Sequence, residues 1–190
     1  LEAKYKLGLF ENPYKYCNVD RPKNDIFTAE NRAAARDIAA ETFVLLKNEG
    51  NLLPLQRKGR IALIGPLADT TANMPGTWSV AAVSERYKSL YEGMKDAVGD
   101  KGEVLYAKGC NLCYDATLEA NATMFGREMR DPRSPQQLTA EALGVAQRAD
   151  VIVFAGGESS EFSGESSSRS NIDLPDAQLD LLKALKKTGK

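Results

Sequence analysis

Three short apolar runs, two of them closed by residues that break regular structure, most constrain how this chain can fold. They cover residues 61–64 (Ile-Ala-Leu-Ile), 104–107 (Val-Leu-Tyr-Ala) and 151–155 (Val-Ile-Val-Phe-Ala). Gly65 and Pro66 follow the first run, and Gly156 and Gly157 follow the third. A continuous apolar run of this length is typical of a strand that is buried on both faces. We therefore expect three strands of a buried sheet.

Helical patterns alternate with these runs. Apolar residues at helical spacing over residues 87–98 precede the second run, and Ser134 and Gln137 form a capping box around Pro135 that predicts a helix leading into the third. A last helix is expected from Pro175 to Gly189, with Leu179, Leu182 and Leu185 facing inward. The alternation predicts an α/β fold with a mostly parallel sheet and right-handed crossovers. A helix at the end of the chain leads us to expect that the next strand is missing and the sheet truncated.

The first 58 residues have a different pattern. A helix is expected to run out at Gly8, and a longer one is predicted over about 29–48, with Thr28 as its N-cap and Gly50 closing it. The first 14 residues have too little apolar content to fold alone. The chain opens at Leu1 with no signal-like region, so we expect both ends to be cut and any targeting segment to lie upstream.

Composition excludes several classes of function. The chain has 190 residues and no histidine, so a Ser-His-Asp triad, a Cys-His pair and a His-ligated metal are excluded within it. The 25 Lys and Arg nearly balance the 26 Asp and Glu, which provides no basic field for nucleic acid or an anionic membrane surface. No apolar stretch approaches the roughly 20 residues that cross a bilayer. Because histidine is absent, acid/base chemistry in this chain must use carboxylates.

Two further patterns predict no cofactor. Cys110 and Cys113 have a C-x-x-C spacing, but a zinc site would need more ligands, and loop-like sequence follows them where a redox motif would open a helix. A structural disulfide or two unreactive thiols remain as alternatives. The loop after the first strand has no G-x-G-x-x-G, and Pro66 removes a backbone N–H that a phosphate cradle would use. The long polar stretch over 108–133 is expected to be a functional or variable loop region.

The loop after the third strand carries the candidate chemistry. In open α/β sheets, sites gather at the carboxyl ends of strands. This loop holds Glu158, Glu161 and Glu165 together with several hydroxyls and Arg169. Glu165 lies between Gly164 and a serine run, a flexible and polar setting for its carboxyl group. The residues alone are equally compatible with a solvated polar loop.

The same loop resembles a known one. Residues 163–165 (Ser-Gly-Glu), Ser168 and Arg169, residues 171–175 (Asn-Ile-Asp-Leu-Pro) and Gln178 are similar to the acid/base loop of glycoside hydrolase family 3, especially of its bacterial β-glucosidase branch. Other segments match in the same order: residues 8–14, 44–49, 52–55, 61–66 and 149–151. The resemblance covers almost the whole chain.

This resemblance implies a two-domain enzyme. A (β/α)₈-type barrel would supply a catalytic Asp nucleophile, and a three-layer α/β sandwich would supply the general acid/base, a position that Glu165 matches. The barrel and its nucleophile motif are absent here. Residues 1–14 would be the tail of the barrel, 15–58 a linker with its helix, and 59–190 the first part of the sandwich. The substrate would be a β-glucoside or oligosaccharide, with no metal or organic cofactor, and the location periplasmic or secreted.

Other residues have open roles. Arg169 is expected to steady the loop or pair with a carboxylate, and Glu158 and Glu161 to shape the loop or be solvated. Trp78 could stack on a sugar ring or serve in packing. Trp78, Arg169 and Glu158 are the candidate substrate-binding residues. The alternative function is a noncatalytic sugar-binding or scaffolding module.

Overall fold

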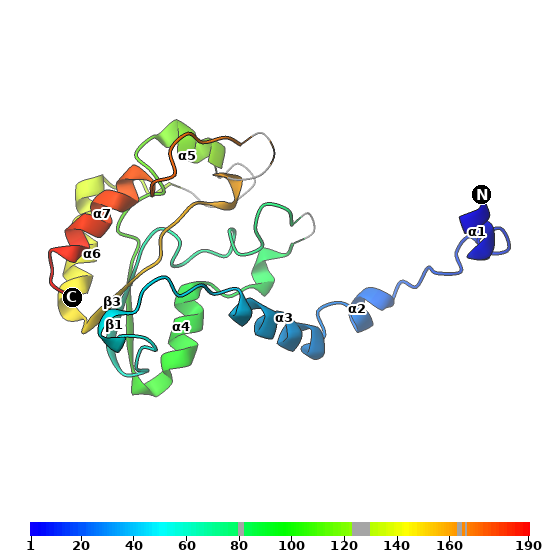
Figure 1. Cartoon of the computed structure of the whole chain (residues 1–190), viewed down its shortest axis with the longest axis horizontal. Coiled ribbons are helices and arrows are strands. Elements are labelled where there is room, and N and C mark those ends of the chain that lie inside the picture. Colours follow the sequence, from blue (N-terminus) through cyan, green and yellow to red (C-terminus); the bar gives the residue numbers. More distant parts are fainter. Residues whose placement is uncertain (80–81, 123–129, 163–164, 166) are drawn as a thin grey trace. The chain divides into compact units, whose positions relative to one another are not determined.

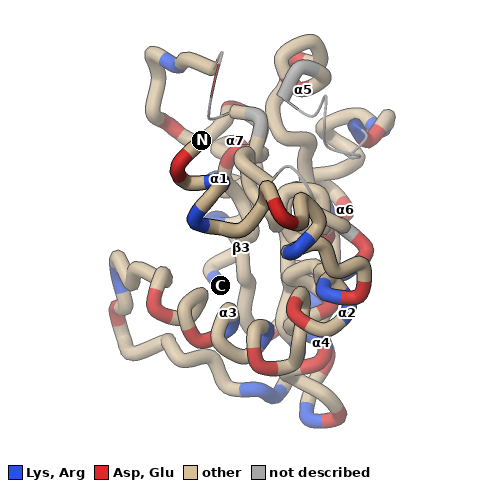
Figure 2. The backbone as a smooth tube through the Cα atoms, turned by 90° about the vertical axis from the view of Figure 1, so that its right-hand side faces the viewer, with Lys and Arg blue, Asp and Glu red and all other residues tan. Residues whose placement is uncertain are grey.

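The computed structural model describes the chain except residues 80–81, 123–129, 163–164 and 166. It divides into two compact units, Leu1–Pro54 and Leu55–Lys190 (Figure 1). Lys and Arg are interspersed with Asp and Glu along the backbone rather than gathered on one element (Figure 2). None of the described helices combines the length and the apolar character that a membrane span requires.

The first unit consists of short helices with little packing. They are α1 (Glu2–Lys6), α2 (Arg21–Asp25), α3 (Ala29–Glu41) and the 3₁₀ turn η1 (Glu49–Asn51). None of the residues Leu1–Pro54, all of which are described, is buried. The expected N-cap of α3 is confirmed, because the Thr28 hydroxyl accepts a hydrogen bond from the Asn31 N–H at 3.1 Å.

Helix α3 ends at Glu41, so the prediction that it reaches residue 48 is wrong. The Thr42 hydroxyl donates to the Ala39 carbonyl at 2.7 Å, which satisfies a carbonyl of the last turn. Phe43 and Val44 follow, and aromatic and β-branched residues lose side-chain freedom in a helix. Since α3 buries no residue, no packing energy offsets that loss.

The second unit is built on a three-stranded parallel sheet. Its strands are β1 (Gly59–Ile64), β2 (Gly102–Ala107) and β3 (Val151–Phe154), in the order β2-β1-β3. Ile61 in the central strand lies opposite Val104 on one side and Val151 on the other. The predicted α/β class and parallel sheet are confirmed.

Helices cover both faces of this sheet (Figure 1). Ala62 and Ile64 pack toward α6 (Pro135–Arg148) and α7 (Asp176–Lys186), whereas Ile61 and Leu63 point to the opposite face. That face is covered by α4 (Leu90–Val98). The alternation follows from the two-residue period of a strand. The result is three layers, helix on sheet on helix.

The predicted capping box of α6 is present. The Ser134 hydroxyl accepts from the Gln137 N–H at 3.2 Å, and the Gln137 side chain accepts from the Ser134 N–H at 2.9 Å. The predicted inward face of α7 is partly wrong. Leu185 is buried, but Leu182 is 36% exposed and Leu179 half-buried.

The buried face of α7 is rotated about the helix axis relative to the predicted one, and the two share only Leu185. It consists of Ala177, Gln178, Leu181 and Leu185. Both sets of residues have helical spacing, so periodicity alone could not choose between them. Docking against α6 and the hydrogen bonds of Gln178 fix the rotation of the helix.

The described part of the long polar stretch, residues 108–122 and 130–133, is more ordered than a surface loop. Cys110, Leu112 and Cys113 are buried, and helix α5 (Ala116–Ala122) follows them, which the sequence did not predict. Glu119 and Arg130 form an ion pair beside this segment. The carboxylate of Glu119 also accepts the Leu112 N–H at 3.2 Å.

Both buried cysteines are free thiols, so the disulfide alternative is not found. Burial raises the pKa of Cys110 to about 12 and that of Cys113 to about 11. The thiolate is the reactive form of cysteine. These are therefore the unreactive thiols of the second alternative.

Candidate active site

The candidate loop begins where β3 leaves the sheet. The Ala155 N–H still donates to the Ile64 carbonyl at 2.8 Å, and the chain then passes through Gly156 and Gly157. A Cβ at Gly156 would lie 2.2 Å from the Phe154 ring and 2.8 Å from the Gln178 side chain. Gly157 has a φ of 143°, which L side chains rarely adopt. The two glycines therefore let the chain turn tightly at the root of the loop.

Gln178 holds that root in place. Its amide group is fully buried; it accepts the Gly157 N–H at 2.8 Å and donates to the carbonyls of Gly157 at 2.8 Å and Leu112 at 2.9 Å. A buried amide without partners would be costly, and this one is well satisfied. Because Gln178 lies in the first turns of α7, it ties the start of the loop to the helix that follows its end.

A second attachment lies further along the loop, at Ser160. Its N–H donates to the Asn73 side-chain oxygen at 2.8 Å, and its carbonyl accepts a hydrogen bond from the Thr77 hydroxyl. Asn73 and Thr77 belong to the loop that follows β1. The loops that follow the central strand and β3 are thereby joined.

The third attachment is an ion pair across the loop. Arg169 pairs with Glu158 and also donates to the Asp173 carbonyl at 3.2 Å. The Arg169 guanidinium lies 5.7 Å from the centre of the Phe162 ring, within the range of a cation–π contact. This pairing with Glu158 is one of the two alternatives expected for Arg169.

Glu165 lies between these attachments, on the part of the loop that reaches solvent. It is exposed, whereas the neighbouring residues 163–164 and 166 lie outside the described structure. Glu161 belongs to the 3₁₀ turn η4 (Ser160–Phe162), and its side chain also lies outside the described part. The arrangement presents the Glu165 carboxyl group from a loop that is anchored on both sides of it.

Trp78 follows Thr77 directly, and its side chain is 69% exposed. It therefore takes no part in the core of its unit. The hydrogen bonds at Ser160 connect its segment to the Glu165 loop. An exposed indole presents a flat apolar face, which suits the apolar face of a sugar ring.

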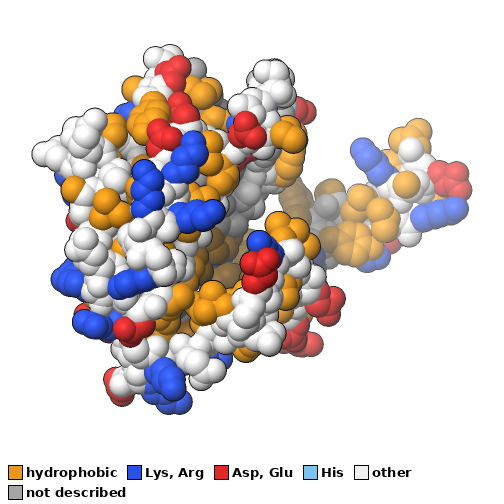
Figure 3. All heavy atoms as spheres, turned by 60° about the vertical axis from the view of Figure 1, so that its left-hand side comes forward, with side chains coloured by type: hydrophobic (Ala, Val, Ile, Leu, Met, Phe, Trp, Pro, Cys, Tyr) orange, Lys and Arg blue, Asp and Glu red, His pale blue; other side chains and the backbone are white. Residues whose placement is uncertain are grey.

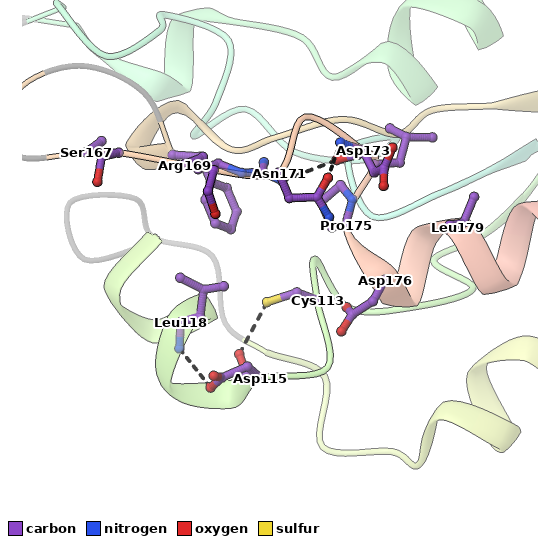
Figure 4. A pocket seen from close by; sticks show the side chains of 14 residues that line it. Cys113, Asp115, Leu118, Ser167, Arg169, Asn171, Asp173, Pro175, Asp176 and Leu179 are labelled. Atoms are coloured by element: carbon purple, nitrogen blue, oxygen red, sulfur yellow. Dashed lines mark hydrogen bonds between the residues drawn. The ribbon is translucent and has the colours of Figure 1, made fainter.

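A pocket of about 680 Å³ lies beneath the second half of the loop (Figure 4). Arg169 and Asn171 line it from the loop, Asp115 from just before α5, Leu118 from α5 and Leu179 from α7. An adjoining pocket of about 520 Å³ includes Glu158. Its lining mixes polar side chains with a few apolar ones such as Leu118, Phe162 and Leu179, as a site for a small organic ligand does. Within the described residues, no group of three His, Cys, Asp or Glu side chains could hold a metal ion.

Three of the residues that hold the loop, Gln178, Asn73 and Thr77, were not assigned roles from the sequence. Gln178 carries a recognisable signal, because it is a polar residue on the buried face of α7. Asn73 and Thr77 carry none, since they bond to a residue more than eighty positions away. Local sequence could not single out Asn73 and Thr77.

On the face drawn in Figure 3, exposed hydrophobic side chains lie among charged ones of both signs.

The fold and the loop together define a class of protein. It is a parallel α/β domain with helices on both faces and its candidate functional residues on loops at the carboxyl ends of strands. Many functions use this architecture, so the fold alone does not name one.

Comparison with known proteins identifies the family. Residues 43–190 match the glycosyl hydrolase family 3 C-terminal domain, and the chain belongs to this family. All of the chain aligns with a periplasmic beta-glucosidase of Salmonella typhimurium at 41% identity, covering 25% of that protein. A beta-xylosidase of Formosa agariphila is 32% identical over the whole chain and is covered to 24%.

A solved structure supports the same assignment. The beta-glucosidase from Listeria innocua in complex with glucose matches all of this chain with a TM-score of 0.76 and 33% identity. The chain covers 22% of that protein. The chain thus spans about a quarter of the length of the relatives that it matches.

Proposed function

We propose that this chain forms part of a β-glucosidase-like, exo-acting glycoside hydrolase and supplies its general acid/base, Glu165. The observation that carries the proposal is an exposed carboxyl group on a loop fixed at Gly157, Ser160 and Arg169. General acid/base catalysis needs a carboxyl group that is accessible to substrate and held in position. Membership of the family and the names of its relatives support the substrate class.

The chemistry requires a second carboxyl group. Retaining glycosidases use two, about 5 to 5.5 Å apart: one attacks the anomeric carbon, and the other protonates the leaving oxygen and then activates water. Glu165 takes the second role in this proposal. The nucleophile is an Asp of a barrel domain outside this chain, so we expect the chain alone to be inactive on β-glucosides. The reaction needs no metal or organic cofactor.

The other candidate residues have supporting roles in this proposal. Glu158 and Arg169 neutralise one another, which favours a role in holding the loop over direct contact with sugar. Trp78 presents an exposed ring, which favours stacking against substrate over packing within the domain.

The first unit fits a role in joining two domains. Its apolar residues 43–46 are all exposed, and contiguous exposed apolar residues indicate a contact surface. We propose that residues 1–14 complete the barrel and residues 15–58 link it to the sandwich over 59–190. A periplasmic location is part of this proposal, because one relative is named for that compartment.

The test is Glu165→Gln in the full-length enzyme. Loss of the acid should lower hydrolysis of a disaccharide or alkyl glucoside by about 10² to 10⁴-fold, while formation of the glycosyl-enzyme from a dinitrophenyl glucoside is largely spared. Its leaving group departs without a proton. The covalent intermediate should accumulate, and azide should speed turnover and give a β-glycosyl azide.

Glu161→Gln is the matched control, because it removes a nearby carboxylate from the same loop. Glu161→Gln should hydrolyse all of these substrates as the parent enzyme does, with no accumulation of the intermediate and no rescue by azide. Equal slowing of good and poor leaving groups by Glu165→Gln, without rescue by azide, would overturn the proposal. Full activity in that variant would favour the noncatalytic module instead.

A further inference from the structure

Two loops that are far apart in the sequence meet at one residue. The backbone N–H of Ser160 donates to the Asn73 side-chain oxygen at 2.8 Å, and the backbone carbonyl accepts from the Thr77 hydroxyl. Both polar backbone groups of Ser160 are thus bound by side chains from the loop after β1. Such a double contact fixes the position of the backbone at this point more firmly than a single hydrogen bond would.

The loop that makes this contact is itself attached to the sheet. It leaves β1 directly, and the Asp69 carboxylate accepts a hydrogen bond from the Ser89 hydroxyl at 2.7 Å, at the N-terminus of α4. The Ser79 hydroxyl donates to the Pro75 carbonyl at 2.8 Å, which closes the turn containing Thr77. The loop is therefore tied to α4 near its start and closed into a turn around Thr77.

The place of Ser160 in the loop gives the contact its importance. Gln178 and the Glu158–Arg169 pair hold the ends of the loop, but a loop held only at its ends retains internal freedom. Ser160 opens the turn η4, a few residues before Glu165. Fixing it restricts the segment that carries the carboxyl group.

We propose that Asn73 and Thr77 are positioning residues for proton transfer by Glu165. The proposal rests on the proposed function. Proton transfer requires the donor within about 2.6–3.2 Å of the leaving oxygen, and a displacement of 1 Å can cost about 10²-fold in rate. Because Trp78 follows Thr77, the loop that positions Glu165 also carries the exposed indole proposed to stack on the sugar.

The test uses paired substitutions in the full-length enzyme. Thr77→Val removes the hydroxyl at nearly constant shape, whereas Thr77→Ser keeps it. Asn73→Leu removes the acceptor, whereas Asn73→Asp keeps an oxygen that can accept the Ser160 N–H. Thr70→Val is the control, since the buried Thr70 hydroxyl in the same loop has no hydrogen-bond partner in the described structure.

Thr77→Val and Asn73→Leu should lower kcat/KM for an alkyl glucoside about 10 to 100-fold, with much less effect on a dinitrophenyl glucoside. Thr77→Ser, Asn73→Asp and Thr70→Val should behave like the parent enzyme. A merely destabilising change would lower the active fraction and slow both substrates equally. The ratio between the two substrates therefore separates positioning from folding.

Glu165→Gln is measured alongside. If it shows the selective loss while Thr77→Val and Asn73→Leu slow both substrates equally or neither, the positioning role is wrong and the proposed function stands. If Glu165→Gln itself shows no selectivity, the acid/base assignment fails and this inference fails with it.

Discussion

The two units of the chain contain leucines in very different surroundings. Leu63, in the central strand of the second unit, is 0% exposed, whereas Leu46, in the first, is 91% exposed. Residues 43–46 and residues 61–64 are both apolar, but only the second unit has a sheet with helices on both faces. The comparison shows that helical periodicity and a good N-cap produce a helix such as α3 without a core. Burial needs a partner surface.

The largest expected difference is between two leucine substitutions. Leu63→Ala should lower the free energy of unfolding by about 2–5 kcal/mol, because it removes buried methyl groups and leaves a cavity between β1 and α4. Leu46→Ala should change it by less than about 0.5 kcal/mol. Denaturant unfolding followed by circular dichroism measures both. Similar losses in the two variants would show that the first unit has a core of its own.

A second pair compares the same hydrogen-bonding pattern in the two units. Gln178 bonds both backbone groups of Gly157 while fully buried, and Asn48, which is only half-buried, bonds both backbone groups of the exposed Leu53. Gln178→Leu should cost about 1–3 kcal/mol, because the buried Leu112 carbonyl and the partly buried backbone groups of Gly157 lose their partner. Asn48→Leu should cost much less, since water replaces the amide. Unfolding midpoints measure the difference, and equal costs would contradict the role of burial.

Helix caps give a smaller contrast. Ser134→Ala removes the cap of α6, which packs on the sheet, and should cost about 1 kcal/mol of unfolding free energy. Thr28→Ala removes the cap of α3, which buries nothing, so only local helicity should fall. Thermal unfolding reports the first and hydrogen exchange of the Asn31 amide the second. A clear drop in global stability for Thr28→Ala would mean that α3 folds together with the second unit.

The smallest expected effect depends on pH. Hydrogen bonds from Arg133 lower the pKa of Asp131 to about 2, from an ordinary value near 3.8. The charged form is favoured in the folded state, so its stabilisation is present above about pH 4 and is lost as the pH falls toward 2. Because the Arg133 side chain is 42% exposed, the contribution should be about 1 kcal/mol or less.

Asp131→Asn tests this contribution. The difference in unfolding free energy between parent and variant should shrink as the pH falls from about 4 to about 2. Asp20→Asn, which breaks an exposed pair with Lys23 in the first unit, is the comparison and should cost less stability at neutral pH. A difference that stays constant with pH would show that the amide, not the charge, matters at position 131.

Much of the second unit could be predicted from local sequence. The apolar runs predicted the strands, and the capping box at Ser134 predicted the start of α6, because these signals depend on neighbours along the chain. The rotation of α7 could not be predicted, since Leu182 and Leu181 fit a helical pattern equally well. Its docking against α6 decided between them.

The same distinction applies to the candidate site. The sequence was sufficient to identify the loop after β3, and its motif singled out Glu165, because the identity and order of neighbouring residues carry that information. Only the tertiary structure brought Asn73 and Thr77 to Ser160 and paired Glu158 with Arg169. Contacts between distant segments depend on how the sheet places its loops. No local pattern records that placement.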